Sequence, residues 1–317
     1  MNDPNYLVIS STIDYSTDLI CCELERRGQN YLRINRDHFS EYQILYTLQN
    51  DSLSIKLGNY AFTITPSRLK SVYFRAPVFL RNMGKPYTLQ EQLYKSQWSS
   101  FIRNLILFDN VAWVNHPVSI YRAENKLYQL KIAQRCCFPV PETYVGNTLP
   151  KSIQPERTYI VKSLDTALFY DNGQEMFTYS TMISGQELSN AEIRSAPIIV
   201  QEYLCDKTDI RATVIGDTIF AVSITKNGCN IEGDWRKNEK ESLMYSPIDL
   251  PMGVQKQIKE LMRKLGLHFG GIDLAMVNGT YYFIEINPTG EWGWLVSTSK
   301  LPIDIAIAEF LVAGGVS

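Results

Sequence analysis

Short apolar runs and a longer helical pattern alternate at the start of the chain. Tyr6–Ser10 and Tyr31–Ile34 are apolar runs that predict strands. Between them, Ser16–Arg27 repeats its apolar residues at helical spacing, and Gly28 ends the pattern. A strand, a helix and a second strand in this order predict a β-α-β unit with a parallel sheet.

The next segments extend this mixed pattern. Ser52–Ile64 alternates apolar and polar residues around Gly58-Asn59, which predicts a hairpin with its turn at those two residues. Ser71–Phe74 predicts another strand, and Thr88–Phe108 has helical spacing without Gly or Pro. The first third of the chain therefore predicts an α/β domain.

The pattern changes after His116. The elements predicted beyond it are a helix over Glu124–Arg135, strands over Tyr159–Lys162 and Ile198–Glu202, a hairpin over Arg211–Ile215 and Thr218–Thr225, and helices over Val254–Leu265 and Ile303–Leu311. Strands and helices again alternate, so the whole chain is predicted to be α/β (α+β).

Composition narrows the class of protein. Of 317 residues, 45% are hydrophobic and 20% charged, which is typical of a soluble globular protein. A net charge of -2 gives no overall basic field for nucleic acid. No apolar run reaches the ~20 residues that span a bilayer, and the N-terminus lacks the pattern of a signal peptide. The six cysteines form no CxxC, which favours free thiols. We expect a cytoplasmic protein without nucleic-acid or membrane partners.

The candidate chemistry lies near the carboxyl end, in GIDLAMVNGTYYFIEINPTGEW. Asp273 is followed by Glu285 and then Asn287, and the last two belong to an apolar strand pattern. An unpaired carboxylate beside such apolar residues would be costly. Mg²⁺ prefers oxygen ligands, and one or two carboxylates together with phosphates suffice to bind it. These three residues are the predicted metal ligands.

Strand register tests this prediction. Alternation places Tyr281, Phe283, Glu285 and Asn287 on one face of their strand. A plain two-residue turn at Asn278-Gly279 would set Asp273 opposite Ile284, on the wrong side. A shared metal therefore predicts an irregularity at about Asn278–Thr280.

From about Asn115 to Pro288 the chain resembles the ATP-grasp superfamily. The matching positions are Lys126 and Lys162, Gln201-Glu202-Tyr203-Leu204, Asp209, Arg211 and Arg236, and Asp273, Glu285 and Asn287. The resemblance implies that Lys126 and Lys162 contact the phosphates of ATP, that the Gln201–Leu204 segment is a hinge that binds adenine, and that Asp209 contacts the ribose. It implies that Arg211 and Arg236 face the phosphates or the reacting carboxylate. Asp273, Glu285 and Asn287 correspond to the Mg²⁺ ligands. It also implies a pre-ATP-grasp domain over 1–115 and ATP-grasp subdomains over 116–190 and 191–317.

One loop departs from the pattern of many ATP-grasp proteins. Ser163–Gly173, which would cover the phosphates, has a single glycine, so backbone cradling of phosphate is not expected there.

The N-terminal third narrows the resemblance. Tyr31-Leu32-Arg33-Ile34-Asn35, Tyr73-Phe74-Arg75-Ala76-Pro77 and Asp234-Trp235-Arg236 are similar to microviridin-type peptide maturases, the graspetide synthetases, which are related to ribosomal-protein glutamate ligases. That family activates Asp or Glu side chains of a precursor peptide as acyl phosphates. It then joins them to Ser, Thr or Lys side chains as macrocyclic esters or amides.

The resemblance implies a precursor peptide with leader and core as the partner, and it leaves a homodimer open. The polar stretch Ser184–Arg194 is the candidate leader-binding segment, with Glu187, Asn190 and Glu192 as its contacts. Arg75 follows a strand end where it would face a cleft. It is a candidate for holding a substrate carboxylate, and a structural salt bridge is the alternative.

Two other functions stay in competition. One is a ligase that adds an amino acid to a protein or small-molecule carboxylate, and the other is a nucleotide sensor without catalysis. The complete Asp273, Glu285 and Asn287 set argues against the sensor. The sequence has no GxxxxGK[ST], GxGxxG, GxSxG or HExxH, so it offers no motif for other nucleotide, serine-hydrolase or zinc chemistry.

Overall fold

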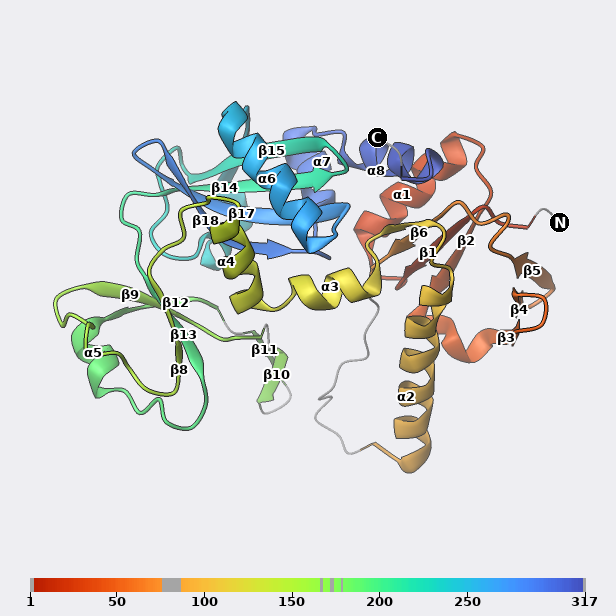
Figure 1. Ribbon diagram of the computed structural model, residues 1–317, viewed down its shortest axis with the longest axis horizontal. Coiled ribbons are helices and arrows are strands. Elements are labelled where there is room, and N and C mark those ends of the chain that lie inside the picture. The colour runs from red at the N-terminus through yellow and green to blue at the C-terminus, as the bar shows by residue number, and fades with distance from the viewer. Residues whose placement is uncertain (1–2, 76–86, 166–167, 172–173, 178, 316–317) are drawn as a thin grey trace.

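A computed structural model of the chain describes residues 3–75, 87–165, 168–171, 174–177 and 179–315. Figure 1 shows three groups of elements, with the red and orange N-terminal part on one side, a five-stranded sheet beside it and a smaller green sheet below. None of the helices in these residues is long and apolar enough to cross a membrane.

The N-terminal sheet is parallel, as the β-α-β pattern predicts. Its strands, in spatial order, are β2 (Tyr31–Asn35), β1 (Tyr6–Ser10), β6 (Ser71–Phe74) and β7 (Ala112–Val114). Every residue of β1 is buried. Leu7 and Ile9 join one apolar cluster and Val8 joins another, because neighbouring residues of a strand point to opposite faces.

Helices and a small meander cover this sheet. They are α1 (Tyr15–Arg26), the 3-10 turn η1 (Arg36–Glu41), strands β3 (Tyr42–Thr47), β4 (Ser52–Leu57) and β5 (Tyr60–Ile64), α2 (Leu89–Asn104) and η2 (Leu105–Leu107). Asp14 caps α1 by accepting a hydrogen bond from the backbone N–H of Thr17. The predicted hairpin is confirmed as β4 and β5, whereas β3 was not predicted.

The smaller sheet follows two helices. This region contains α3 (Pro117–Ala123), α4 (Lys126–Arg135), β8 (Thr143–Gly146), β9 (Thr158–Lys162), the β10–β11 hairpin (Leu168–Asp171 and Gln174–Phe177), β12 (Thr181–Ser184), α5 (Gly185–Asn190) and β13 (Ile198–Glu202). The strand order is β12-β9-β13-β8, and all pairs are antiparallel.

The five-stranded sheet is antiparallel and carries most of the candidate residues. Its strands, in spatial order, are β16 (Leu243–Ile248), β15 (Thr218–Lys226), β14 (Thr208–Ile215), β17 (Phe269–Val277) and β18 (Thr280–Asn287). The turns and helices around it are η3 (Trp235–Lys237), η4 (Lys240–Ser242), α6 (Met252–Leu265), α7 (Gly293–Ser299) and α8 (Ile303–Val312). Gly266 ends α6 at a φ of 69°, as predicted.

The C-terminal helix joins the N-terminal sheet to the five-stranded sheet. α8 packs against α1, β6 and β14 (Figure 1). Its Ile303 and Ile307 lie in one core with Val8 and Ile20. On the other side, α4 packs against β18 and α6. The five-stranded sheet is therefore packed against α8 through β14 and against α4 through β18.

Candidate nucleotide and metal site

The β17–β18 hairpin brings two carboxylates face to face. Asp273 pairs directly with Glu285, although Leu274 pairs with Phe283, so Ile284 is the extra residue of a β-bulge. The predicted irregularity at Asn278–Thr280 is wrong in position, because Asn278 and Gly279 form a two-residue turn with φ values of 49° and 79°. The register change lies beside the site instead.

The bulge also corrects the predicted faces of β18. Phe283 and Ile286 both belong to the apolar core against α4 and α6, although they are three residues apart. Ile284 lines a cleft instead. The strict alternation that placed Phe283 on the same face as Glu285 is therefore wrong.

The guanidinium group of Arg236 lies between the two carboxylates. The Nη1 of Arg236 is 2.9 Å from Glu285 Oε1 and 3.7 Å from Asp273 Oδ2. Arg236 is held by Asp234, whose Oδ1 accepts from its Nε at 2.9 Å. Burial raises the pKa of Glu285, but Arg236, Lys162 and Lys126 together lower that pKa to about 2. Glu285 is thus an ionised carboxylate in a cationic setting.

These groups fit a divalent cation. Among the described residues, no three His, Cys, Asp or Glu side chains cluster as a metal site. Two carboxylates and an amide oxygen nevertheless match the limited protein ligation of Mg²⁺ beside phosphates. The Asn287 Oδ1 accepts from the backbone N–H of Thr289 at 3.1 Å, so the amide lies at the start of the following loop. The bridging Arg236 guanidinium indicates that the carboxylate pair stabilises positive charge.

Two lysines approach the same carboxylates. The Lys126 Nζ is 3.9 Å from Glu285 Oε2 and donates to the Ser163 carbonyl at 3.3 Å. Lys162 ends β9, and its Nζ makes no hydrogen bond or ion pair with any other residue that the structure describes. Burial lowers the pKa of Lys162, and the charge of Glu285 opposes that effect. An ammonium held in this way is suited to phosphate oxygens.

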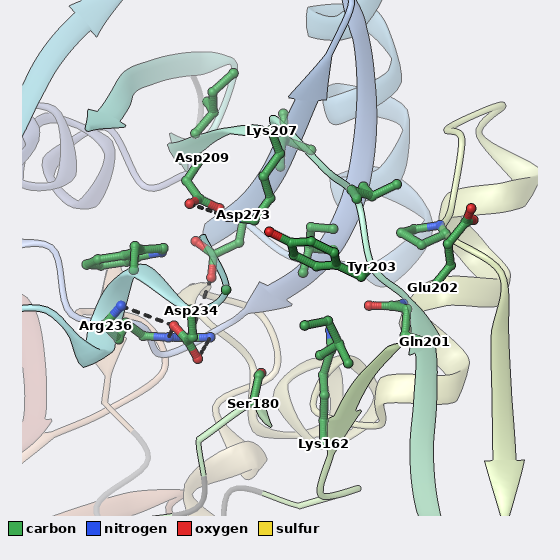
Figure 2. A pocket seen from close by; sticks show the side chains of 18 residues that line it. Lys162, Ser180, Gln201, Glu202, Tyr203, Lys207, Asp209, Asp234, Arg236 and Asp273 are labelled. Carbon is green, nitrogen blue, oxygen red and sulfur yellow. Dashed lines mark hydrogen bonds and ion pairs between the residues drawn. The ribbon is translucent and has the colours of Figure 1, made fainter. Parts of the chain in front are cut away.

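A cleft of about 640 Å³, counted with its open mouth, begins beside these groups (Figure 2). Many of the predicted residues line it: Lys162, Gln201, Glu202, Tyr203, Leu204, Asp209, Arg236 and Asp273. Pro141, Ile160, Leu274 and Ile284 give it an apolar part. Its mixed polar and apolar lining is typical of small-molecule sites.

The predicted hinge lies between the two antiparallel sheets. Gln201 Nε2 donates to Thr143 Oγ1 at 2.9 Å, and the Glu202 N–H donates to the Glu142 carbonyl at 2.8 Å. These bonds fix the end of β13. Tyr203, which follows it, lines the cleft (Figure 2), as does Leu204.

Asp209 has a partner that the sequence reading missed. Lys207 forms an ion pair with it and donates to the Ile231 carbonyl at 3.3 Å. Burial raises the pKa of Asp209 to about 6, Lys207 opposes this, and Asp273 and Asp234 add to it. The i, i+2 spacing of Lys207 and Asp209 in an extended segment was the available signal.

Arg211 lies behind Asp273. Its side chain is 9% exposed, and its Nη1 donates to Asp273 Oδ1 at 2.9 Å. A Cβ added at Gly271 or Gly290 would lie 2.3 or 2.6 Å from its Nη2, so these two glycines form a slot for the guanidinium. These contacts suit a residue that orients Asp273 better than the predicted direct role on a reacting carboxylate.

The other predicted residues are engaged elsewhere. Arg75 pairs with Asp14 and Glu291, which corresponds to the structural alternative. The Glu187 carboxylate completes a capping box with Ser184 at the start of α5. The other two candidate leader contacts, Asn190 and Glu192, are exposed. Within the phosphate-covering loop Ser163–Gly173, residues 166–167 and 172–173 lie outside the described residues, as do Ala76 and Pro77 of the N-terminal motif.

Part of the chain matches a known family of protein domains. Residues 160–311 match the model of the RimK-like ATP-grasp domain. The chain has the ATP-grasp fold, and this part of it is similar to RimK-like domains. A probable alpha-L-glutamate ligase of Haemophilus ducreyi is 24% identical to the ATP-grasp chain over 206 residues, which are 64% of this chain and 67% of that protein.

Two solved structures are similar over nearly the whole ATP-grasp chain. The macrocyclase MdnC from Microcystis aeruginosa MRC, bound with precursor peptide MdnA, has a TM-score of 0.82 and 26% identity, covering 97% of this chain and 99% of MdnC. A RiPP-associated ATP-grasp ligase of Chryseobacterium gregarium, in complex with ADP and a leader and core peptide, has a TM-score of 0.81 and 24% identity, covering 99% and 97%. The predicted ATP-grasp fold and ATP-dependent ligase class are confirmed.

Proposed function

We propose that this chain is a peptide-modifying ATP-grasp ligase. It would activate Asp or Glu side chains of a precursor peptide and join them to Ser, Thr or Lys side chains, forming macrocyclic ω-esters or ω-amides. The observation that carries the proposal is the pair Asp273 and Glu285, which face each other beside the bulge, hold the Arg236 guanidinium between them and lie next to the cleft. The likeness to MdnC supports a peptide substrate.

In this proposal ATP binds with adenine in the apolar part of the cleft, against the Gln201–Leu204 segment. Asp209 would meet the ribose, and Lys126 and Lys162 would neutralise the phosphates. Asp273, Glu285 and Asn287 would hold Mg²⁺. When bound, Mg²⁺ supplies charge neutralisation at the phosphate oxygens.

The reaction balances in two steps. A substrate carboxylate oxygen attacks the γ-phosphorus, the bond from that phosphorus to the β–γ bridging oxygen breaks, and ADP leaves. A hydroxyl or amine then attacks the acyl carbon of the acyl phosphate, inorganic phosphate leaves, and the nucleophile releases its proton. Phosphoryl transfer depends mainly on positioning and charge. Arg236, once released from the carboxylates, has the planar guanidinium suited to the acyl phosphate.

The peptide leader has a candidate binding segment after β12. In our proposal, residues 184–194 bind the leader, with Asn190 and Glu192 as contacts. Glu187 is left out of the contacts because its carboxylate caps α5. The division at about 115 and 190 also remains our proposal, as does a homodimer.

A second function is favoured by the probable alpha-L-glutamate ligase relative. The chain would then add a free amino acid to a carboxylate through the same acyl phosphate. Mass spectrometry separates the two, because an internal link lowers the mass of the peptide by one water, whereas an added residue raises it.

The test uses the purified full chain with ATP, Mg²⁺ and a short peptide that is encoded beside its gene and is rich in Thr/Ser and Glu/Asp. We expect ADP release together with dehydrated peptide, and a loss of about 10²–10³ in rate for Glu285→Gln. Glu260→Gln is the matched control, since the ion pairs that Glu260 forms with other described residues are those with Arg263 and Lys264 of its own helix α6. Full activity of Glu285→Gln, or ADP release with unchanged peptide in the wild type, would contradict the proposal.

A further inference from the structure

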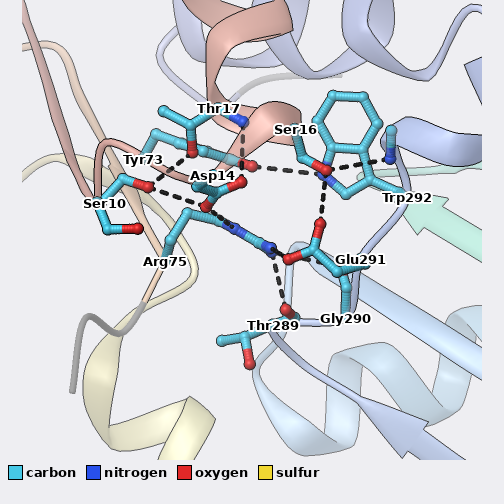
Figure 3. A network of polar contacts seen from close by, with 12 residues as sticks. Ser10, Asp14, Ser16, Thr17, Tyr73, Arg75, Thr289, Gly290, Glu291 and Trp292 are labelled. Atoms are coloured by element: carbon cyan, nitrogen blue, oxygen red, sulfur yellow. Dashed lines mark hydrogen bonds and ion pairs between the residues drawn. The ribbon is translucent and has the colours of Figure 1, made fainter. Parts of the chain in front are cut away.

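The loop after β18 is held from both sides by buried arginines. Residues 288–291 follow Asn287 and lead to α7. Arg75, whose side chain is 6% exposed, reaches this loop from the N-terminal sheet. Its Nη1 donates to the carbonyls of Thr289 at 2.8 Å and Gly290 at 3.3 Å, and its Nη2 is 2.6 Å from Glu291 Oε1 (Figure 3).

On its own side, Arg75 is anchored at the start of α1. Its Nε is 3.0 Å from Asp14 Oδ2, which also accepts from Ser10 Oγ at 2.9 Å. Burial raises the pKa of Asp14, but Arg75 and these hydrogen bonds lower it overall, so the pair is charged. Ser16 continues the network, because its Oγ donates to Glu291 Oε2 at 2.8 Å.

The opposite side of the loop touches the carboxylate pair. Arg211 donates to the Glu291 carbonyl at 3.4 Å and to Asp273 at 2.9 Å, with Gly290 packed against its guanidinium. Within the loop, the Gly290 N–H donates to the Asn287 carbonyl at 3.3 Å. A displacement of the loop would therefore move Asn287 and loosen Asp273.

We propose that Arg75 is a positioning residue, which fixes loop 288–291 from the N-terminal sheet and so holds Asn287 and Asp273 in the arrangement that a divalent cation requires. This inference rests on the proposed function. It assigns Arg75 to the metal end of the nucleotide site rather than to the substrate, because its nitrogens already bind two carboxylates and two carbonyls of the protein. The N-terminal sheet thereby contributes to nucleotide binding without touching the nucleotide.

The test compares ADP binding with and without Mg²⁺ by calorimetry, which needs no peptide. We expect Arg75→Gln to weaken ADP binding about tenfold in Mg²⁺, as for lost outer partners of metal ligands, and to leave binding in EDTA unchanged. Glu291→Gln removes only the exposed end of the network and should show a smaller loss of the same kind. Arg75→Lys keeps a charge near Asp14 but lacks the fork, so it should restore only part of the affinity.

Arg27→Gln is the control, because Arg27 also joins α1 to a distant part of the chain, through Glu309 at 2.9 Å on α8. It should bind ADP like the wild type under both conditions. Hydrogen exchange gives a readout without metal, and the amides of 289–293 should exchange faster in Arg75→Gln and Glu291→Gln than in Arg27→Gln.

Several results would overturn this role for Arg75. Wild-type ADP affinity of Arg75→Gln in Mg²⁺ would do so, and so would an equal loss in EDTA. A change confined to the KM for peptide would place Arg75 on the substrate instead. If Mg²⁺ does not change ADP binding by the wild type, both the proposed metal site and this inference are refuted. If Mg²⁺ strengthens ADP binding equally in the wild type and in the Arg75 variants, only the inference is refuted.

Discussion

Two adjacent glycines of β17 have different neighbours and allow a sharp test of the carboxylate pair. A Cβ at Gly271 would lie 2.3 Å from Arg211 Nη2 and 2.5 Å from its Cζ, so Gly271→Ala must push the guanidinium out of its slot. A Cβ at Gly270 would instead lie 2.8 Å from Ile286 Cδ1, in the apolar core. The two substitutions add the same methyl group on opposite faces of one strand.

The expected magnitudes follow from these neighbours. Displacing Arg211 breaks its 2.9 Å bond to Asp273, whose exposed fraction is 7%. A buried group that loses such a partner destabilises the protein by about 1–3 kcal/mol. The misplaced carboxylate should also lower kcat by about 10²-fold, the loss typical of one preorganised contact. Gly270→Ala should destabilise by about 1–3 kcal/mol through overpacking, with kcat nearly unchanged.

The assay measures ADP release with peptide, alongside urea unfolding of each variant. The double variant Gly271→Ala/Arg211→Ala should be no slower than Arg211→Ala alone, because both changes act through one side chain. A folded Gly271→Ala protein with wild-type kcat would refute the view that Arg211 orients Asp273. Equal losses of kcat in both alanine variants would attribute the effect to general strain in β17.

Two further predictions concern stability. Because burial raises the pKa of Asp209 from 3.8 to about 6, its ionised form is disfavoured in the folded state, and its contribution to the free energy of unfolding should fall as pH rises from about 4 to 6. Asp209→Asn should remove this pH dependence. In chemical unfolding, the free energy of unfolding of the variant should rise by up to about 3 kcal/mol relative to that of the wild type across this pH range. Parallel pH curves for the two proteins would contradict the assignment. Gln129, which is 3% exposed, accepts from the Ile286 N–H at 3.0 Å and donates to its carbonyl at 2.8 Å. Gln129→Leu should therefore destabilise by about 3 kcal/mol in thermal or urea unfolding, since two buried backbone groups lose partners, and an unchanged melting temperature would contradict this reading.

Elements with a strong local period could be predicted from the sequence. The stripe of Val254, Ile258, Leu261, Met262 and Leu265 is the buried face of α6. The β-α-β opening is likewise confirmed. The strand β3 was missed because its burial alternates only weakly. The helix α3 was not predicted, although it begins at Pro117 and proline is favoured at the first position of a helix.

For the candidate site, the sequence predicted the residues but not their partners. Residue identities and order pointed to the cleft, since most of the predicted nucleotide residues line it. Partners did not follow from the sequence, because the contacts that engage Arg75 come from residues 61 and 216 positions away along the chain. Lys207 was within reach, as it lies two residues before Asp209.

The bulge explains how Asp273 and Glu285 come to face each other although the predicted position of the irregularity was wrong. In β18, Phe283 and Ile286 lie in the core, and Glu285 faces Asp273. Regular alternation cannot give both arrangements, because residues three apart point to opposite faces of a strand. One extra residue, Ile284, allows both arrangements and places an apolar side chain in the cleft. A turn irregularity at Asn278–Thr280 would have shifted Tyr281 and Phe283 together with Glu285, so only a bulge between Phe283 and Glu285 separates the core register from the site register.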